Sequence, residues 1–400
     1  MIYLDNHATT RVDPRVVETM LPFFSEAYGN AGSTGHTFGE TASDAVERSR
    51  EVIASGIGAV PQEIVFTSGA TESNNLAIRG VAERSRRRGN HLVSVQTEHQ
   101  AVLGPLARLA KRDYEVTLLD VEPHFSDMAS DRAGWLDPQK VADALREETV
   151  LVSVMLANNE IGVIQPLAEI GAICRERGVL LHCDATQAVG KISVDVEQLH
   201  VDLMSFSAHK MYGPKGVGAL YIRRRDPIVR LDSQIVGGGQ ESGRRSGTLN
   251  VPGIVGFARA LELCLDEFPE EAKRQADLRD QLWAGLCQQL ENLQLCGPAL
   301  ESSLRLPGNL NVTFGDVDGE ALQMAMNDLA VSSGATCAST EAGPSHVLLA
   351  LGLSVDQARS SLRFGLSRFN HVDEIERASG IVVQGVQKLR KIASHQADQA

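Results

Sequence analysis

One segment decides how the chain is interpreted: Ser205-Phe206-Ser207-Ala208-His209-Lys210-Met211-Tyr212-Gly213-Pro214-Lys215-Gly216. It places a lysine between an apolar run typical of a strand and a turn rich in glycine and proline. An amine that is buried at such a boundary loses its proton more easily and can form a Schiff base with an aldehyde. Pyridoxal phosphate is the aldehyde cofactor most often held in this way. A lysine in such a turn is otherwise usually solvated, so the surrounding sequence has to support this interpretation.

Working outward from this segment, short apolar runs alternate with amphipathic stretches such as Asn75–Arg87 and Leu103–Lys111. This alternation predicts βαβ units and an α/β fold, in which a mostly parallel seven-stranded sheet lies between helices. Ligands of such sheets bind at the carboxyl ends of the strands. The predicted strands are Glu63–Thr67, His91–Val95, Glu115–Leu119, Val150–Met155, Val179–Cys183, Leu203–Phe206 and Ala219–Ile222.

The pattern changes after Pro252 and predicts a smaller α+β domain. We expect a large domain over residues 12–258 and a small domain formed by residues 1–11 and 259–400. The small domain carries a loop rich in glycine and serine at 332–346. Its predicted elements are a long helix Ile254–Leu290, strands Asn309–Phe314 and Ser361–Phe364, and a closing helix Glu374–Leu389.

Composition narrows the class of protein. The 400 residues carry a net charge of −13, which argues against a nucleic-acid partner. No stretch is apolar enough to span a bilayer and the start has no signal-peptide pattern, so we expect a cytoplasmic protein that has no membrane partner. The six cysteines have no zinc-like spacing, and we expect no metal site.

Polar residues follow three of the predicted strands. Ser68–Ser73 precedes a helix and could bind a phosphate at the helix N-terminus, although plain N-capping by Thr71 or Ser73 explains the same pattern. His99 follows the second strand and could stack on an aromatic cofactor. Asp184 follows the fifth strand, and an acid beside a pyridine nitrogen keeps that nitrogen protonated.

These residues and Cys337 are where the chain resembles a known family, the cysteine desulfurases of the NifS/IscS type, which are fold-type I pyridoxal-phosphate enzymes of the class V aminotransferase group. The similar motifs run almost from end to end, which makes the match specific. They are Leu4–Thr10, Phe66–Ala77, Thr97–His99, Asn158–Gly162, His182–Gln187, Ser205–Gly216, Arg245–Thr248 and Ser332–Cys337.

The resemblance implies a role for each matching residue. Lys210 would hold the cofactor and move protons, Asp184 would pair with the pyridine nitrogen, and Gln187 would bind the ring hydroxyl. His99 would stack on the ring and act as an acid/base near the substrate thiol. The phosphate would be bound by Thr71, Ser207, His209 and the backbone of Ala70, with Thr248 reaching it from the second subunit of a homodimer. Asn159 and Arg363 would hold the substrate carboxylate, and Asn159 would also contact the cofactor.

Cys337 decides the expected reaction. As a thiolate, it would take the sulfur of L-cysteine as a persulfide and leave L-alanine, after which an acceptor such as an iron–sulfur scaffold protein would receive the sulfur. Three alternatives stay open. The chain could be a selenocysteine lyase, a class V aminotransferase, or a scaffold that binds pyridoxal phosphate without turnover. A thiol in a loop of small residues favours the desulfurase over the aminotransferase.

Overall fold

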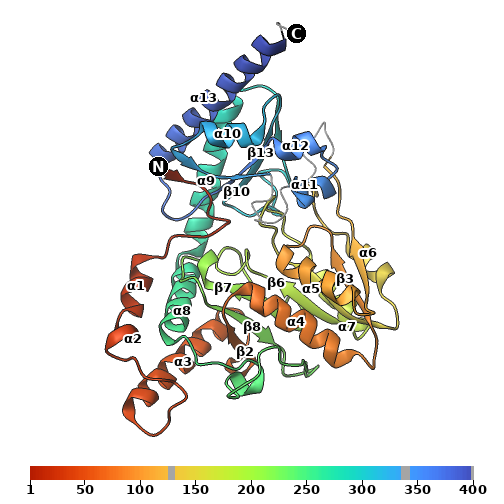
Figure 1. Cartoon of the computed structure of the whole chain (residues 1–400), viewed down its shortest axis with the longest axis vertical. Helices are drawn as coiled ribbons and strands as arrows, with labels where there is room; N and C mark the ends of the chain where they lie inside the picture. Colours follow the sequence, from red (N-terminus) through yellow and green to blue (C-terminus); the bar gives the residue numbers. More distant parts are fainter. Residues whose placement is uncertain (125–130, 335–342, 398–400) are drawn as a thin grey trace.

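The large sheet confirms the predicted fold class. The computed structural model describes residues 1–124, 131–334 and 343–397, and its largest sheet has seven strands in the order β2-β8-β7-β6-β5-β3-β4 (Figure 1). Strand β8 is antiparallel to both of its neighbours, and the other pairs are parallel. All seven predicted strands are confirmed with small shifts at their ends. They are β2 Ile64–Thr67, β3 His91–Val95, β4 Glu115–Leu119, β5 Thr149–Met155, β6 Leu180–Asp184, β7 Leu203–Ser207 and β8 Gly218–Ile222.

Helices cover both faces of this sheet. Alternate strand residues point to opposite faces, so Val65 and Leu220 pack beneath α4 and α5, whereas Phe66 and Phe206 pack on the other side. On that second side, the rings of Phe206 and Phe257 lie 5.5 Å apart. Burial on both faces explains why the inner strands are mostly apolar runs, whereas Glu115 and Leu118 of the edge strand β4 are exposed. The helices around the sheet are α1 Pro14–Met20, α2 Pro22–Ser25, α3 Thr37–Ser55, α4 Ala70–Ser85, α5 Gln100–Ala110, α6 Pro138–Ala144, α7 Leu167–Glu176 and α8 Val251–Asp266.

A second, antiparallel sheet of four strands has the order β12-β13-β10-β9 and its own apolar core. Leu286 of α9, Phe314 of β10 and Val382 of α13 belong to that core. Strand β1 pairs with β11, which ties the chain start to this part of the molecule; the domain boundaries themselves stay a prediction. The elements here are β1 Ile2–Tyr3, α9 Phe268–Cys287, β9 Leu293–Leu295, β10 Asn309–Phe314, α10 Gly319–Ala325, β11 Leu329–Ala330, β12 Ser332–Ser333, α11 His346–Ala350, α12 Val355–Arg359, β13 Ser361–Gly365 and α13 Val372–Ala397.

The prediction of one continuous helix over Ile254–Leu290 is wrong. Helix α8 ends at Asp266 and α9 begins at Phe268. Pro269 in the first turn of α9 has no N–H to donate, so it suits the start of a helix and not its interior. In Figure 1, α8 lies beside the large sheet and α9 continues toward the small one.

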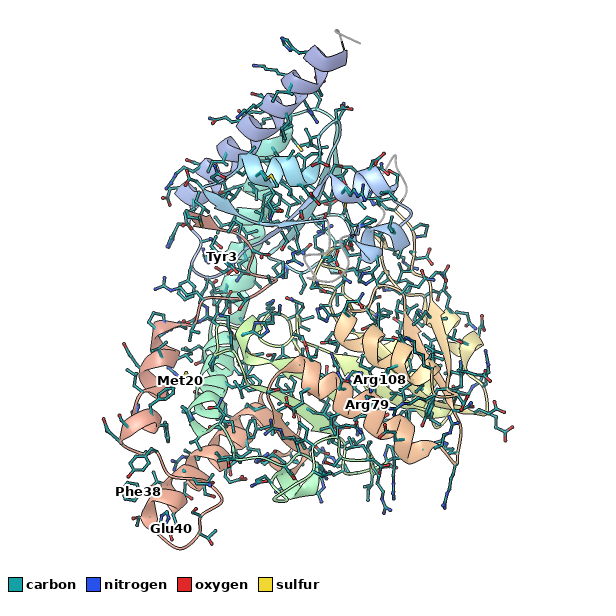
Figure 2. The ribbon with its side chains drawn as sticks, viewed as in Figure 1. Tyr3, Met20, Phe38, Glu40, Arg79 and Arg108 are labelled. Atoms are coloured by element: carbon teal, nitrogen blue, oxygen red, sulfur yellow. The ribbon has the colours of Figure 1, made fainter. Side chains whose placement is uncertain are left out.

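The N-terminal segment connects the two sheets. Tyr3 lies beside the small sheet, whereas Met20 and Phe38 lie among helices toward the opposite end of the molecule (Figure 2). Between them, Thr10 N–H donates to the carbonyl of His209 at 3.0 Å. Residues 5–10 therefore pass directly beside the lysine segment. None of the helices in the described ranges is long and apolar enough to cross a bilayer.

Candidate active site

A cavity of about 740 Å³ lies at the carboxyl ends of the parallel strands, where ligands of such sheets bind. Thr248 is exposed and lies outside its lining, and Cys337 falls outside the described residues. Every other site residue expected from the sequence lines the cavity: Ala70, Thr71, His99, Asn159, Asp184, Gln187, Ser207, His209, Lys210 and Arg363.

Lys210 ends the short 3₁₀ turn that follows β7. Its Nζ donates to the carbonyl oxygens of His7 and Ala8, at 2.6 Å each. Burial, and then the nearby charge of Arg363, lowers the pKa of the amine to about 8. An amine that is partly neutral near pH 7 is a competent nucleophile toward an aldehyde.

An anion-binding corner is formed where β2 leads into α4. The N-cap of α4 is Gly69, with φ 151° and no side-chain cap, so the N-cap predicted at Thr71 or Ser73 is wrong. The N–H groups of the first helical turn have no partner within the helix and attract anions. A Cβ added to Gly218 would lie 2.7 Å from the Cα of Gly69, so the two glycines permit this close approach.

His209 and Ser207 line the same corner. The Nδ1 of His209 lies 3.1 Å from the Oγ1 of Thr9. Burial, and then the charge of Lys210, lowers the pKa of His209 to about 4, which keeps the imidazole neutral. It can therefore donate one hydrogen bond to an anion without being an ion itself. The backbone and these side chains together suit a phosphate group.

Asp184, at the end of β6, is held in a fixed orientation. Its Oδ2 accepts from the Nδ2 of Asn74 at 2.7 Å, and its Oδ1 accepts from the N–H of Thr186 at 3.0 Å. Asn74 is fully buried, and its own Oδ1 has no partner in the described part of the chain. No role was predicted for Asn74 from the sequence. Its position one helical turn after Ala70 could have indicated that it faces the site.

Hydrogen bonding fixes the tautomer of His99. Its Nδ1 accepts from the backbone N–H of Ala101 at 3.0 Å, so this imidazole caps α5. Neutral His99 must therefore carry its hydrogen on Nε2. Burial lowers its pKa, which favours this neutral form. In this neutral tautomer Nε2 of His99 is a hydrogen-bond donor, and the acid/base role expected for His99 stays a prediction.

Glu98, the residue before His99, is a buried acid that lines the cavity. Its Oε1 accepts from the N–H of Met155 at 2.6 Å, and its buried Oε2 has no partner among the described residues. Burial raises the pKa of this carboxyl well above its usual range. The sequence analysis quoted Glu98 only as part of a motif.

Gln187 is fixed by two residues that the sequence analysis missed. Its Oε1 is 2.5 Å from the Nζ of Lys191, which donates to it, and 3.1 Å from the Nδ1 of His7. Its Nε2 donates to the carbonyl of His7 at 2.8 Å. Because Oε1 is already engaged, the remaining hydrogen of Nε2 is available to a ligand oxygen. Burial lowers the pKa of Lys191 to about 7.

Besides Lys210, the cavity has a second cationic side chain, Arg363 of β13. Its Nη2 donates to Asp5 Oδ1 at 3.0 Å and to Ser332 Oγ at 2.8 Å, and its Nη1 donates to the backbone oxygen of Asn159 at 3.3 Å. Its Nε is buried without a partner among the described residues. A guanidinium that still has donor capacity suits a carboxylate. The cavity therefore combines groups that suit a phosphate, a carboxylate and an aldehyde.

Comparison with known proteins agrees with this geometry. The model of the class-V aminotransferase family matches residues 2–378. The cysteine desulfurase IscS of Anaeromyxobacter dehalogenans is 55% identical over 98% of this chain and 94% of its own length, and that of Methylococcus capsulatus is 51% identical over the same shares.

Solved structures show the same likeness. A NifS-like protein superimposes with a TM-score of 0.86 at 38% identity, covering 98% of this chain and 99% of its own. SspA in complex with cysteine gives a TM-score of 0.79 at 34% identity, covering 93% and 100%. With the matched family model and these relatives over nearly its whole length, the chain belongs to the class-V aminotransferase family, on the branch whose members are cysteine desulfurases of the IscS and NifS type.

Proposed function

We propose that this protein is a pyridoxal-phosphate-dependent cysteine desulfurase. It converts L-cysteine to L-alanine, collects the sulfur as a persulfide on Cys337, and donates it for iron–sulfur cluster or other thio-cofactor assembly. The observation that carries the proposal is the convergence of Lys210, Asp184, His99 and Arg363 on one cavity. These side chains come from distant parts of the chain, and a purely structural role would not require them to meet.

The residues present fit pyridoxal phosphate. The uncapped start of α4, with Ser207 and His209, suits its phosphate. The oriented carboxylate of Asp184 suits its ring nitrogen, and the free hydrogen of Gln187 Nε2 suits its ring hydroxyl. When bound, this cofactor supplies an electron sink that makes bonds at the substrate's carbons cleavable.

Arg363 and Asn159 are the cavity residues that would select the substrate. Arg363 and Asn159 would bind the carboxylate of the amino acid, with Asp5 and Ser332 holding the guanidinium in place. The structural relative SspA, solved in complex with cysteine, supports an amino acid of that size.

The described residues that flank the segment containing Cys337 support the role of this thiol. Residues on both sides of it, Gly334 and Ser345, line the cavity, and the N–H of Ser345 donates to the carbonyl of Gly334 at 2.7 Å. The chain therefore enters and leaves this segment at the cavity. Of the other cysteines, only Cys287 is exposed. It is the last residue of α9 and is not among the residues that line the cavity.

A homodimer forms part of the proposal. Thr248 is exposed on its own chain, and the nearby Val236 exposes 81% of its surface. If a second copy packs over the segment between Val236 and Thr248, Thr248 of one copy can reach the phosphate corner of the other. Mixing Lys210→Ala with Thr248→Ala protein tests this arrangement, because only a shared site lets two defective chains regain activity in mixed dimers.

The test of the reaction is the release of alanine and sulfide from L-cysteine with a reductant. We expect equal amounts of both products from the wild type. Cys337→Ala should release neither while keeping its bound cofactor, and Cys287→Ala should match the wild type. Full activity in Cys337→Ala would refute the role of that thiol. Amino-group transfer to a keto acid would instead indicate an aminotransferase.

A further inference from the structure

We propose that Nδ1 of His346 is the group that accepts a proton from a thiol inside the cavity. This inference rests on the proposed desulfurase function and deepens it. The desulfurase reaction needs a thiolate, and a thiol becomes one only when a base takes its proton. His346 is a cavity residue to which the sequence analysis gave no role.

The fold holds His346 firmly at the cavity. It is the first residue of α11, directly after the N-cap Ser345. The Oγ of Ser345 accepts from the N–H of Leu348 at 3.2 Å and donates to Glu160 Oε2 at 2.5 Å. The N–H of Ser345 is bonded to Gly334 across the base of the intervening segment. Three hydrogen bonds of the neighbouring Ser345 therefore hold His346 in place.

The hydrogen bond to Glu98 fixes the tautomer of His346. Its Nε2 lies 2.9 Å from the backbone oxygen of Glu98. A carbonyl oxygen only accepts, so Nε2 carries the hydrogen and Nδ1 of the neutral ring has a lone pair. That Nδ1 has no hydrogen bond to the described residues, and it is not among their fully buried unpartnered atoms. Because His346 lines the cavity, we take this lone pair as the proton acceptor there.

The two cavity imidazoles thus have opposite tautomers. His99 uses its Nδ1 lone pair to cap α5 and keeps its hydrogen on Nε2, so in this arrangement it donates. His346 uses its Nε2 hydrogen for the Glu98 carbonyl and keeps its lone pair on Nδ1, so it accepts. Of these two neutral rings, only His346 has a lone pair that is not engaged by a described residue, so it is the imidazole that can accept the proton of a thiol.

Other titratable and charged residues line the cavity with His346: the acids Glu160, which accepts from the adjacent Ser345, and Asp184, and the bases Lys210 and Arg363. Burial raises the pKa of the Glu98 carboxyl and lowers the pKa of His99, which favours the uncharged form of each.

The proposed step is a simple proton transfer. The S–H bond breaks, an N–H bond forms at Nδ1, and the electron pair stays on sulfur. The imidazolium keeps its Nε2–H bonded to Glu98 throughout. Two thiols qualify as the donor, the side chain of bound L-cysteine and that of Cys337.

Two substitutions in the holoenzyme distinguish a role of His346 in proton transfer from a structural role of its hydrogen bond to Glu98. His346→Gln places an amide N–H where it can still donate to the Glu98 carbonyl, but it supplies no titratable nitrogen. His346→Leu removes both functions. We expect both variants to lose about 100-fold in kcat/KM, in line with the loss of a general base. His346→Gln should keep the wild-type cofactor content and unfolding midpoint, and it should lose the acidic limb of the pH profile.

Alkylation by iodoacetamide, measured by mass spectrometry on the Cys337 peptide across pH without substrate, identifies the donor. A changed pH dependence in His346→Gln assigns Cys337 as the thiol. Unchanged alkylation together with lost turnover assigns the substrate thiol. Either result supports the inference.

A His346→Gln variant with wild-type kcat/KM and pH profile would overturn it, and a defect confined to His346→Leu would leave only a supporting role for the ring. Both of these outcomes leave the proposed function intact. A wild type that releases no alanine from L-cysteine refutes the proposed function itself and this inference with it.

Discussion

The lowered pKa of Lys210 leads to a quantitative prediction about cofactor capture. With a pKa of about 8, roughly one-tenth of the amine is neutral at pH 7. For an amine at the ordinary lysine pKa of 10.5 the neutral fraction is only about 0.0003, so burial increases the reactive form by about 300-fold. Because the pKa is lowered, the neutral form appears at lower pH and is already nearly complete at pH 9.

The assay is the rate at which cofactor-free protein captures pyridoxal phosphate at Lys210, trapped by borohydride and located by peptide mapping. We expect the rate to rise up to about pH 9 and then to level off. Between pH 9 and 10.5 an unperturbed amine would still gain about 16-fold, whereas Lys210 should gain almost nothing. A lysine peptide of the same local sequence provides the reference curve.

Substitution of Arg363 tests the second cause of the shift. Arg363→Met removes a positive charge that lowers the pKa of Lys210, so the midpoint should move to higher pH. Arg377→Met changes an exposed arginine on α13 and serves as the control. A wild-type midpoint near pH 10 would show that burial does not lower the pKa of Lys210 and would refute this reasoning.

Two further predictions concern support of the site and of the small sheet. Asn74→Ala removes the 2.7 Å bond to Asp184 and should lower kcat by about 10- to 100-fold with the fold intact, because a lost bond to a charged group costs roughly 1.5–3 kcal/mol. Asn75→Ala removes a bond from Nδ2 to the carbonyl of Thr71 in the same helix and should have little effect in the same alanine-release assay. Leu282→Ala empties a fully buried position and should lower the free energy of unfolding by about 2–5 kcal/mol in a denaturant titration, whereas Leu265→Ala, at a side chain 43% exposed, should cost far less. Equal losses within either pair would contradict the roles of Asn74 and Leu282.

The sequence by itself determined the elements and most of the site. The seven strands of the large sheet were predicted because each is a short, mostly apolar run between polar turns, which is a local signal. Six of them are largely buried, whereas the edge strand β4 has two exposed residues, Glu115 and Leu118. The cavity residues after β2, β3, β6 and β7 were predicted because parallel strands end at one edge. The continuous helix over Ile254–Leu290 failed because the apolar pattern persists across Glu267, and only Pro269 indicated the break.

Only the tertiary structure decided which groups support those residues. The carbonyls of His7 and Ala8 reach Lys210 from about two hundred residues away, and no periodicity encodes that contact. The directions of proton donation at His99 and His346 likewise depend on single backbone partners, Ala101 and the carbonyl of Glu98. Residue type determines what a side chain can do, but its hydrogen-bond partners in the folded chain determine which of its atoms is left to do it.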